Sequence, residues 1–377
     1  MTEVEAEMAA TQTARHEPSP RPADPLAQAG LCAACPKLCR PTCPVQAATG
    51  RESVAPWRIS VTVRDAQSGG WDDGSLHAAS SCTGCGACSH ACLAGVTLPD
   101  ESRAARAQAA TQGVVLPAAR ALARRIAATG SPRRGSPWGA ALADGSDPAA
   151  PTMLHFGCAV QSDVPQVGYA ARLLFSAARQ VVRCAADEGC CGAAALDVGL
   201  AGEARQLAAG LAAQLAGVAE VVVISPGCAR VIRDEWPDWG LTPPTVRSAV
   251  EWLAAALADG ALTLPAADAA EPVAWHDPCT LARGLGVVAA PRAVLTALGV
   301  EVREPADTGL RTRCSGAGAG YPLVDPGGAE AVAAARRAEL EALDADVATA
   351  CPAAMRALGA RDILELAADR IAPPTGP

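Results

Sequence analysis

The stretch CTGCGACSHAC, residues 82–92, packs four cysteines into eleven residues. A related run, CAACPKLCRPTCP at residues 32–44, carries four more. Cysteines separated by two residues on a turning backbone can direct their thiolates onto one iron-sulfur cubane, and the fourth cysteine of each run ligates the other cluster in two-cluster ferredoxins. The spacing therefore predicts a compact, loop-bearing module with two 4Fe-4S clusters.

Because the fourth cysteine of each run is expected to ligate the cluster of the other run, the eight cysteines divide into two sets. One cluster is expected on Cys32, Cys35, Cys39 and Cys92, and the other on Cys82, Cys85, Cys88 and Cys43. The first run departs from the usual spacing because three residues separate its second and third cysteines. A pair of zinc knuckles is the alternative, but zinc sites usually have two well-separated CxxC pairs. The unbroken second run favours iron-sulfur.

The sequence outside this module predicts further regions of different composition. We expect a disordered tail at 1–28, the cluster module at 29–100, a helical and Gly/Pro-rich linker at 101–150, and two cysteine-rich domains at 151–265 and 266–377. Short β-rich runs alternate with alanine-rich helices after residue 151. Strands are predicted at 153–156, 180–184, 221–225, 273–275, 300–303 and 347–349, and helices at 166–178, 202–216, 292–298 and 328–343. Such alternation is typical of a parallel α/β sheet.

The cysteines of the two later regions repeat. Cys158, Cys190 and Cys228 map onto Cys279, Cys314 and Cys351 with offsets of 121, 124 and 123 residues, and His155 maps onto His276 with an offset of 121. This repeat predicts an internal duplication. Loops at the carboxyl ends of parallel strands meet at one edge, so each half should gather its cysteines at one site. The predicted metal ligands are Cys158, Cys190, Cys191 and Cys228 in the first half, and Cys279, Cys314 and Cys351 in the second.

The motifs HFGC at 155–158, CCG at 190–192 and SPGC at 225–228, with HDPC, CSG and CP in the second half, resemble the cysteine-rich CCG domains of the heterodisulfide reductase family. They also resemble the iron-sulfur subunits of glycolate, lactate and anaerobic glycerol-3-phosphate dehydrogenases. In such proteins a two-cluster ferredoxin segment precedes two of these domains. The resemblance covers residues 29–370 and implies an α-helical ferredoxin-like module followed by duplicated Rossmann-like parallel α/β domains.

This sequence departs from the full family motif of a lone cysteine, then CC, then CxxC. Val231 and Ala354 occupy the place of the last cysteine, and Ser315 that of the second CC cysteine. The first half keeps four thiolates, enough for a cubane. The second half keeps three, which His276, Asp277, Ser315 or water could complete as a zinc site or as a cluster with an open iron.

Several other residues near the cysteines have two interpretations. His155 and His276 either hydrogen bond to cluster sulfur or bond to backbone. Arg230, Arg283 and Arg313 adjoin predicted ligands, and they either offset thiolate charge or lie on the surface. The glycines of 314–322 imitate a nucleotide loop, but a close backbone approach to a cluster explains them better, so no NAD or FAD site is assigned. Cys184 has no counterpart in the second half, and we expect it to be a buried structural thiol.

The charge and hydropathy of the chain limit the classes of partner and the cellular location that we expect. The chain has 31 Lys and Arg against 39 Asp and Glu, a net charge of −8, and no basic stripe with interleaved aromatics, so nucleic acid is not an expected partner. No uncharged apolar stretch reaches the roughly 18 residues of a membrane-spanning helix. The N-terminal residues lack the features of a secretory signal. We expect a cytoplasmic protein, at most peripheral to a membrane through a partner.

The leading hypothesis is an iron-sulfur electron-transfer subunit. It would pass electrons between a flavoprotein dehydrogenase, acting on a 2-hydroxy acid or similar substrate, and a quinone or other acceptor. The resemblance associates catalytic disulfide reduction with a five-cysteine cluster. Because cysteines of that motif are missing here, electron transfer is favoured over disulfide reduction. A catalytic heterodisulfide or disulfide reductase is one alternative, and a redox-inert zinc scaffold for protein assembly is another.

Overall fold

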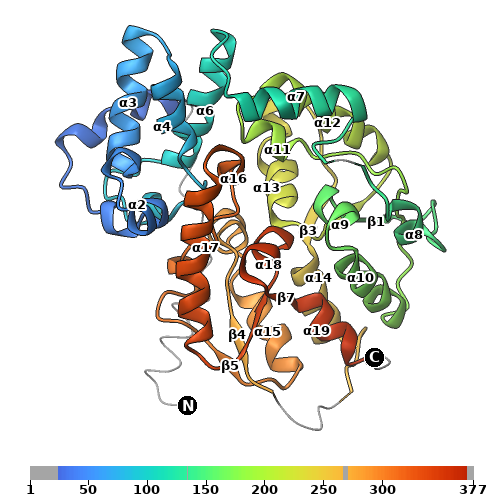
Figure 1. The fold of residues 1–377 in the computed structure, drawn as a ribbon. Helices are drawn as coiled ribbons and strands as arrows, with labels where there is room; N and C mark the ends of the chain where they lie inside the picture. Colours follow the sequence, from blue (N-terminus) through green and yellow to red (C-terminus); the bar gives the residue numbers. More distant parts are fainter. Residues whose placement is uncertain (1–23, 134, 266–270, 372–377) are drawn as a thin grey trace.

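The N-terminal region is helical and lies at one end of the molecule (Figure 1). The computed structural model describes residues 24–133, 135–265 and 271–371. Proline in the first turn begins several of these helices, where its fixed φ and missing N–H are tolerated. The helices are η1 (Pro25–Gln28), η2 (Leu31–Ala34), η3 (Arg40–Thr42), α2 (Pro44–Thr49), η4 (Glu52–Val54), α3 (Pro56–Gly69), α4 (Asp73–Ser80), α5 (Ala87–His90) and α6 (Leu98–Thr111). Helices α7 (Pro117–Thr129) and α8 (Gly139–Ala143) lead to the sheets.

The first sheet is parallel, with strand order β1-β2-β3. Its strands are β1 (Thr152–His155), β2 (Glu220–Val223) and β3 (Thr245–Ser248). The strand predicted at 180–184 is wrong, because that segment makes a single bridge, between Met153 and Arg183, at the free edge of β1. Val181 there is 61% exposed. Strand β3 was not predicted, since prolines precede it and the charged Arg247 interrupts its apolar pattern.

The second sheet is also parallel and has the order β5-β4-β6-β7. Its strands are β4 (Val273–Trp275), β5 (Val302–Arg303), β6 (Asp346–Thr349) and β7 (Arg361–Asp362). If the edge segment at 180–184 is counted as a strand of the first sheet, both sheets have the same topology. With the strands of each half numbered in chain order, they lie side by side in the order second, first, third, fourth. The predicted strands at 273–275, 300–303 and 347–349 are confirmed in place. The two-residue β7 is too short for an alternating pattern to reveal it.

Helices cover both sheets. In the first half they are α9 (Cys158–Ser162), α10 (Pro165–Ala177), α11 (Ala193–Leu196), α12 (Ala201–Gln214), α13 (Pro226–Asp234), η5 (Pro237–Trp239) and α14 (Ala249–Ala258). In the second half they are the π-helical turn η6 (Thr280–Gly284), α15 (Ala289–Ala297), η7 (Gly309–Arg311), α16 (Tyr321–Val324), α17 (Pro326–Glu341), α18 (Pro352–Leu358) and α19 (Ile363–Asp369).

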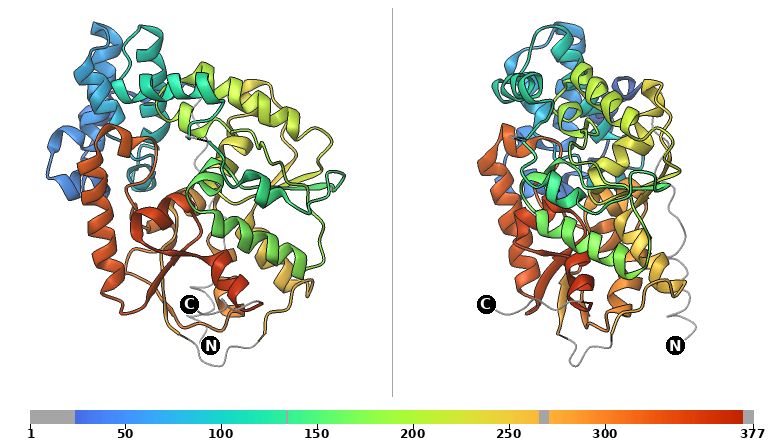
Figure 2. Two further views of the ribbon diagram at one scale, coloured as in Figure 1. Left: turned by 45° about the vertical axis from the view of Figure 1, so that its right-hand side comes forward. Right: turned by 90° about the vertical axis from the view of Figure 1, so that its right-hand side faces the viewer.

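One hydrophobic core joins the two halves. Leu154 and Val222 of the first sheet belong to the same buried cluster as Trp275 and Ala348 of the second. Helix α10 packs against α19, and α14 against α15. The N-terminal helices contact the second half as well, because α2 packs on α17 and α4 on α16. Both views of Figure 2 show the red-orange segment of α16 and α17 beside the blue helices. The three regions therefore form one packed body.

A buried carboxyl group at the start of α19 makes stability depend on pH. Asp362 is 1% exposed and caps the helix by accepting the Leu364 N–H at 3.0 Å. Burial raises the pKa of Asp362 to about 7. The folded chain thus holds a proton that the unfolded chain releases near pH 4, so stability falls as pH rises from about 4 to about 7.

We expect Asp362→Asn to keep the cap and to remove this part of the slope. Urea unfolding at pH 4.5 and pH 8 measures the difference. Relative to the parent, the variant should gain stability at pH 8. Parallel pH profiles for the two proteins would contradict the burial argument.

Candidate iron-sulfur and thiol sites

In each half, two of the cysteines follow two neighbouring parallel strands of the sheet. Cys158 begins α9 directly after β1, and Cys228 lies in the first turn of α13 after β2. Cys279 follows β4 and caps η6, and Cys351 follows β6 and caps α18. These loops meet where the strand order reverses, which is the usual ligand crevice of open parallel sheets.

The first half brings its four cysteines into one row. The thiols of Cys158, Cys190, Cys191 and Cys228 contact one another in that order by hydrogen bonds. Contact with Cys190, together with burial, raises the pKa of Cys158 far above its usual value. Without a bound cation these thiols stay protonated, whereas a metal centre would hold them as thiolates. Val231, in place of the fifth family cysteine, is buried and apolar.

A charged histidine adjoins this row. His155 Nδ1 lies 3.1 Å from Glu188 Oε1, and both side chains are fully buried. Glu188 also accepts the backbone N–H groups of Phe156 at 2.9 Å and Gly157 at 2.7 Å. Burial lowers the pKa of His155, but the Glu188 carboxylate and the contact with Cys191 outweigh it and raise the pKa to about 10. The imidazolium therefore offsets negative charge at the thiols.

The second half brings together a different set. Cys314 packs in one buried cluster with Cys85 of the N-terminal region, and Cys279 packs against the same cluster. Cys351 packs against a different cluster, and burial is the main cause that raises its pKa to about 11. The contact between Cys85 and Cys314 was not predicted from the sequence.

The two polar side chains considered as further ligands in this half have other partners. Arg336 Nε donates to His276 Nδ1 at 3.2 Å, and burial, then the Arg336 charge, lower the pKa of His276 to about 3. Asp277 accepts from Trp275 Nε1 at 3.0 Å and ion pairs with Arg292. Within residues 24–133, 135–265 and 271–371, no three Cys, His, Asp or Glu side chains converge on a single-ion site.

The N-terminal region gathers its eight thiols into two sets. Cys39 lies within electrostatic reach of Cys32, Cys35 and Cys92, and burial is the main cause that raises its pKa to about 11. Cys43, Cys82, Cys85 and Cys88 line one small cavity. The fourth cysteine of each run therefore lies with the other run.

Two family models match the chain over these thiol sets. The 4Fe-4S dicluster domain matches residues 28–96, and the cysteine-rich domain matches twice, at 152–233 and 273–356. The chain joins a 4Fe-4S dicluster domain to two cysteine-rich domains. This is the arrangement of heterodisulfide reductase-like iron-sulfur proteins, as the motifs predicted.

Curated relatives match parts of the chain. One subunit of the fumarate reductase (CoM/CoB) of Methanothermobacter marburgensis is 27% identical over 275 residues, which are 72% of this chain and 55% of that protein. One subunit of the dihydromethanophenazine:CoB--CoM heterodisulfide reductase of Methanosarcina mazei is 32% identical over 173 residues, 44% of this chain and 42% of that protein. A probable membrane-anchored ferredoxin of Chromohalobacter salexigens is 42% identical over 84 residues, 22% of this chain and 12% of that protein. The matches thus span about half or less of these relatives.

No helix among the described residues has the length and apolar character that crossing a membrane requires.

A recurrent turn holds one cysteine of each thiol set. In each case the N–H of the second residue after the cysteine donates to its Sγ, and that residue has a left-handed φ. The four turns are Cys35 with Lys37 (3.4 Å, φ 64°), Cys82 with Gly84 (3.4 Å, φ 68°), Cys190 with Gly192 (3.4 Å, φ 92°) and Cys314 with Gly316 (3.3 Å, φ 79°). N–H donors to sulfur stabilise thiolates and tune clusters. In three of the four turns, the residue with the left-handed φ is a glycine two places after the cysteine, and this spacing is visible in the sequence.

Gly192 is the most constrained of these positions. A Cβ there would lie 2.5 Å from the Ala204 carbonyl oxygen, and its φ is left-handed. We expect Gly192→Ala to lower the free energy of unfolding by about 2 kcal/mol. Gly210→Ala in helix α12 is the matched control, because its Cβ would meet nothing within 4 Å, and it should raise stability by about 0.5–1 kcal/mol. Urea unfolding measures both, and equal effects would contradict the constraint.

The glycines of 314–322 let two loops dock. A Cβ on Gly318 would lie 2.4 Å from the Thr83 carbonyl oxygen, so the second cysteine-rich domain approaches the dicluster loop directly. The sequence predicted a close approach to a cluster, and the structure shows that the close neighbour is this loop. Arg283 fastens the contact, because its Nε donates to the Cys85 carbonyl at 2.7 Å and its Nη1 to the Thr312 carbonyl at 2.8 Å.

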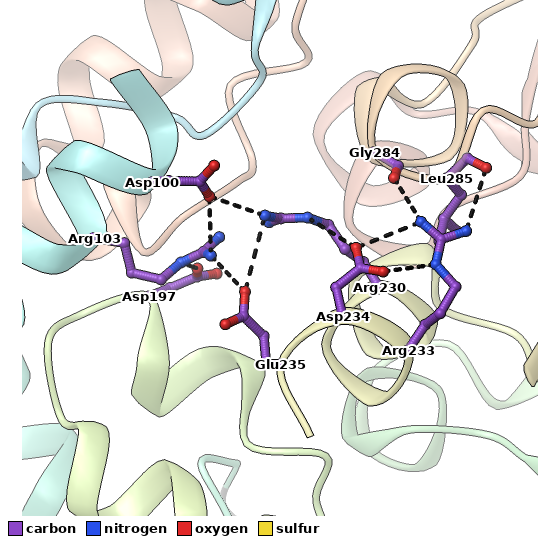
Figure 3. A network of polar contacts seen from close by, with 9 residues as sticks. All are labelled: Asp100, Arg103, Asp197, Arg230, Arg233, Asp234, Glu235, Gly284 and Leu285. Atoms are coloured by element: carbon purple, nitrogen blue, oxygen red, sulfur yellow. Dashed lines mark hydrogen bonds and ion pairs between the residues drawn. The ribbon is translucent and has the colours of Figure 1, made fainter. Parts of the chain in front are cut away.

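Buried charges join helix α6 to the first cysteine-rich domain (Figure 3). Arg103 on α6 lies 2.8 Å from Glu235, 3.5 Å from Asp100 and 3.6 Å from Asp197. Arg230 on α13 reaches Asp100 at 3.2 Å. The side chains of Arg103, Asp100 and Glu235 are no more than 9% exposed.

Neighbouring arginines behave differently from one another. Arg233, whose side chain is 38% exposed, reaches the second cysteine-rich domain by donating to the Gly284 carbonyl at 2.9 Å. Arg313 is 56% exposed and pairs with Asp307 and Glu339 at the surface. Of the arginines next to predicted ligands, Arg230 and Arg283 are therefore interface residues, and Arg313 is a surface residue.

Proposed function

We propose that this protein is an iron-sulfur electron-transfer subunit of an oxidoreductase complex. It passes electrons between a flavoprotein dehydrogenase, acting on a 2-hydroxy acid or similar substrate, and a quinone or other acceptor. The observation that carries the proposal is that cysteines of the two dicluster thiol sets share one buried cluster, and the second set shares another with Cys279 and Cys314 of the second cysteine-rich domain. The relatives support it, because their names are those of reductase subunits.

Three sets of four thiols are proposed to hold clusters. They are Cys32, Cys35, Cys39 and Cys92; Cys43, Cys82, Cys85 and Cys88; and Cys158, Cys190, Cys191 and Cys228. The donor chemistry fits, because these thiols are partly or fully buried, several have raised pKa values, and each set has an N–H donor to sulfur. Bound 4Fe-4S clusters supply one-electron transfer with little rearrangement of their ligands.

The chain's own residues position and insulate these sites. The left-handed turns fix the thiol directions, and His155 with Glu188 places a positive charge at the first cysteine-rich domain. Arg283 holds the dicluster loop against the second cysteine-rich domain. We infer that the two cysteine-rich domains are Rossmann-like and arose by duplication, since both sheets share one strand order. Peripheral membrane association through a partner is part of the proposal, supported by the relative named as membrane-anchored.

Purification without oxygen tests the function. The protein should be brown, hold iron and acid-labile sulfide for at least the two dicluster sets, and lose its visible absorption with dithionite. A colourless protein with stoichiometric zinc would overturn the proposal in favour of an assembly scaffold. An anaerobic pull-down from the source cells should then recover a flavoprotein, identified by its bound flavin.

A spectroscopic test distinguishes the electron-transfer subunit from a catalytic disulfide reductase. With Val231 in the place of the fifth cysteine, the first cysteine-rich domain offers four thiols. We therefore expect the electron paramagnetic resonance spectrum of the reduced protein to be indifferent to added organic disulfides. A disulfide-induced change in that spectrum would support the reductase instead.

A further inference from the structure

The second cysteine-rich domain differs from the other three thiol sites in the number and contacts of its cysteines. It has three cysteines, of which Cys279 packs against the buried cluster that contains Cys314, whereas Cys351 packs against a different cluster. The neighbouring His276 and Asp277 are engaged by Arg336 and by Arg292 and Trp275, as described above. The second cysteine-rich domain therefore provides a close pair of thiols, and His276 and Asp277 are not free to complete a metal or cluster site.

The pair lies beside a proposed cluster set. Cys314 packs in the same buried cluster as Cys85, one of the four thiols of the second dicluster set. The docking of Gly318 on Thr83 and the bond from Arg283 to the Cys85 carbonyl fix this contact. Electrons that reach the Cys85 set therefore need to cross only a thiol contact to reach the pair.

A large cavity opens on Cys279, one member of the pair. It has a volume of about 610 Å³, and its walls come from the dicluster domain and both cysteine-rich domains, including Cys85, Cys279, Arg230 and Arg283. Polar side chains such as Asp100 and Thr280 line it. A cavity of this size with polar groups on its wall holds water. Protons can therefore reach Cys279.

We propose that Cys279 and Cys314 form a redox-active dithiol that closes to a disulfide and reopens. Opening breaks the S–S bond and consumes two electrons and two protons, giving two thiols. The electrons come one at a time from the 4Fe-4S centre at the Cys85 set, and the protons come from water in the cavity. Closing is the reverse: two electrons leave through the same centre and two protons pass to water. The pair thus stores two electrons between one-electron carriers, and this role rests on the proposed function as the source of those electrons.

Differential alkylation with peptide mapping tests the proposal in the whole, cluster-loaded protein. One sample is equilibrated with ferricyanide and one with dithionite, and each is then denatured in excess N-ethylmaleimide without oxygen. Trypsin places Cys279, Cys314 and Cys351 on three different peptides, because cleavage follows Arg283, Arg313, Arg336 and Arg337. The oxidised sample should contain the Cys279 and Cys314 peptides joined by a disulfide, and the reduced sample should contain both alkylated. The difference is two thiols per chain.

Controls separate the alternatives. Cys184, which lies outside the thiol sets, should be alkylated in both states, and Cys351→Ser should leave the linked peptides unchanged. Cys279→Ser should abolish the link and leave iron and sulfide content at the parent value. Absence of the linked peptides in the oxidised parent would overturn the proposal. Loss of a cluster's worth of iron from Cys279→Ser would also overturn it, by making Cys279 a metal ligand. A parent protein without iron would refute the proposed function, while the peptide map would still decide whether the disulfide forms.

Discussion

Replacing Cys92 by serine should remove the cluster of the first run, although Cys92 belongs to the second run in sequence. The reason is spatial, because Cys92 lies with Cys32 and Cys39, and Cys43 lies with the second run. A cubane that loses one of four thiolates is held weakly. We expect Cys92→Ser to lose one of the two dicluster-type paramagnetic signals and the iron of one 4Fe-4S cluster, with the other signal unchanged.

The matched variant is Cys43→Ser, which should remove the opposite signal. Cys85→Ser should resemble Cys43→Ser, because both thiols belong to the same set. Low-temperature electron paramagnetic resonance of dithionite-reduced protein, with iron and sulfide determination on the same samples, distinguishes the signals. If Cys92→Ser and Cys85→Ser lose the same signal, the ligands are not crossed and the two runs bind their clusters separately.

The crossed sets are a prediction that the sequence allows because they depend on local spacing. Two CxxC turns and a fourth cysteine fix which thiols can converge, whatever surrounds them. The cysteines after β1 and β2 were predictable for a similar reason, since the carboxyl ends of parallel strands always meet at one edge. The resemblance to the cysteine-rich family supplied the order of the domains.

Contacts between distant parts of the chain were not predictable. The thiols of Cys85 and Cys314 meet only because the glycine-rich loop docks on the dicluster loop, and one sequence does not reveal such docking. His155 and His276 look equivalent, yet a buried Glu188 faces one and Arg336 faces the other, so only His155 is charged. The partner of a buried polar group is set by tertiary packing.

Arg103 shows the same limit and leads to the second large effect. In the sequence it lies in an ordinary polar helix, but its side chain is 9% exposed and ion pairs with three carboxylates from two domains. Removing one member of a buried charge network leaves its partners uncompensated, which typically reduces stability by about 3–5 kcal/mol. We expect Arg103→Leu to lower the free energy of unfolding by that amount, measured by urea unfolding under anaerobic conditions.

Two comparisons make this result specific to the buried network. Arg64→Leu removes an arginine whose ion pair with Asp65 is about half exposed, and it should change stability far less, because water screens such a pair. Adding Glu235→Leu to Arg103→Leu should restore part of the loss, since the second change removes a charge that the first left unpaired. A loss in Arg103→Leu no larger than in Arg64→Leu would mean that the network does not hold the domains together. The packing of α2 on α17 and the Arg283 contact would then carry that role.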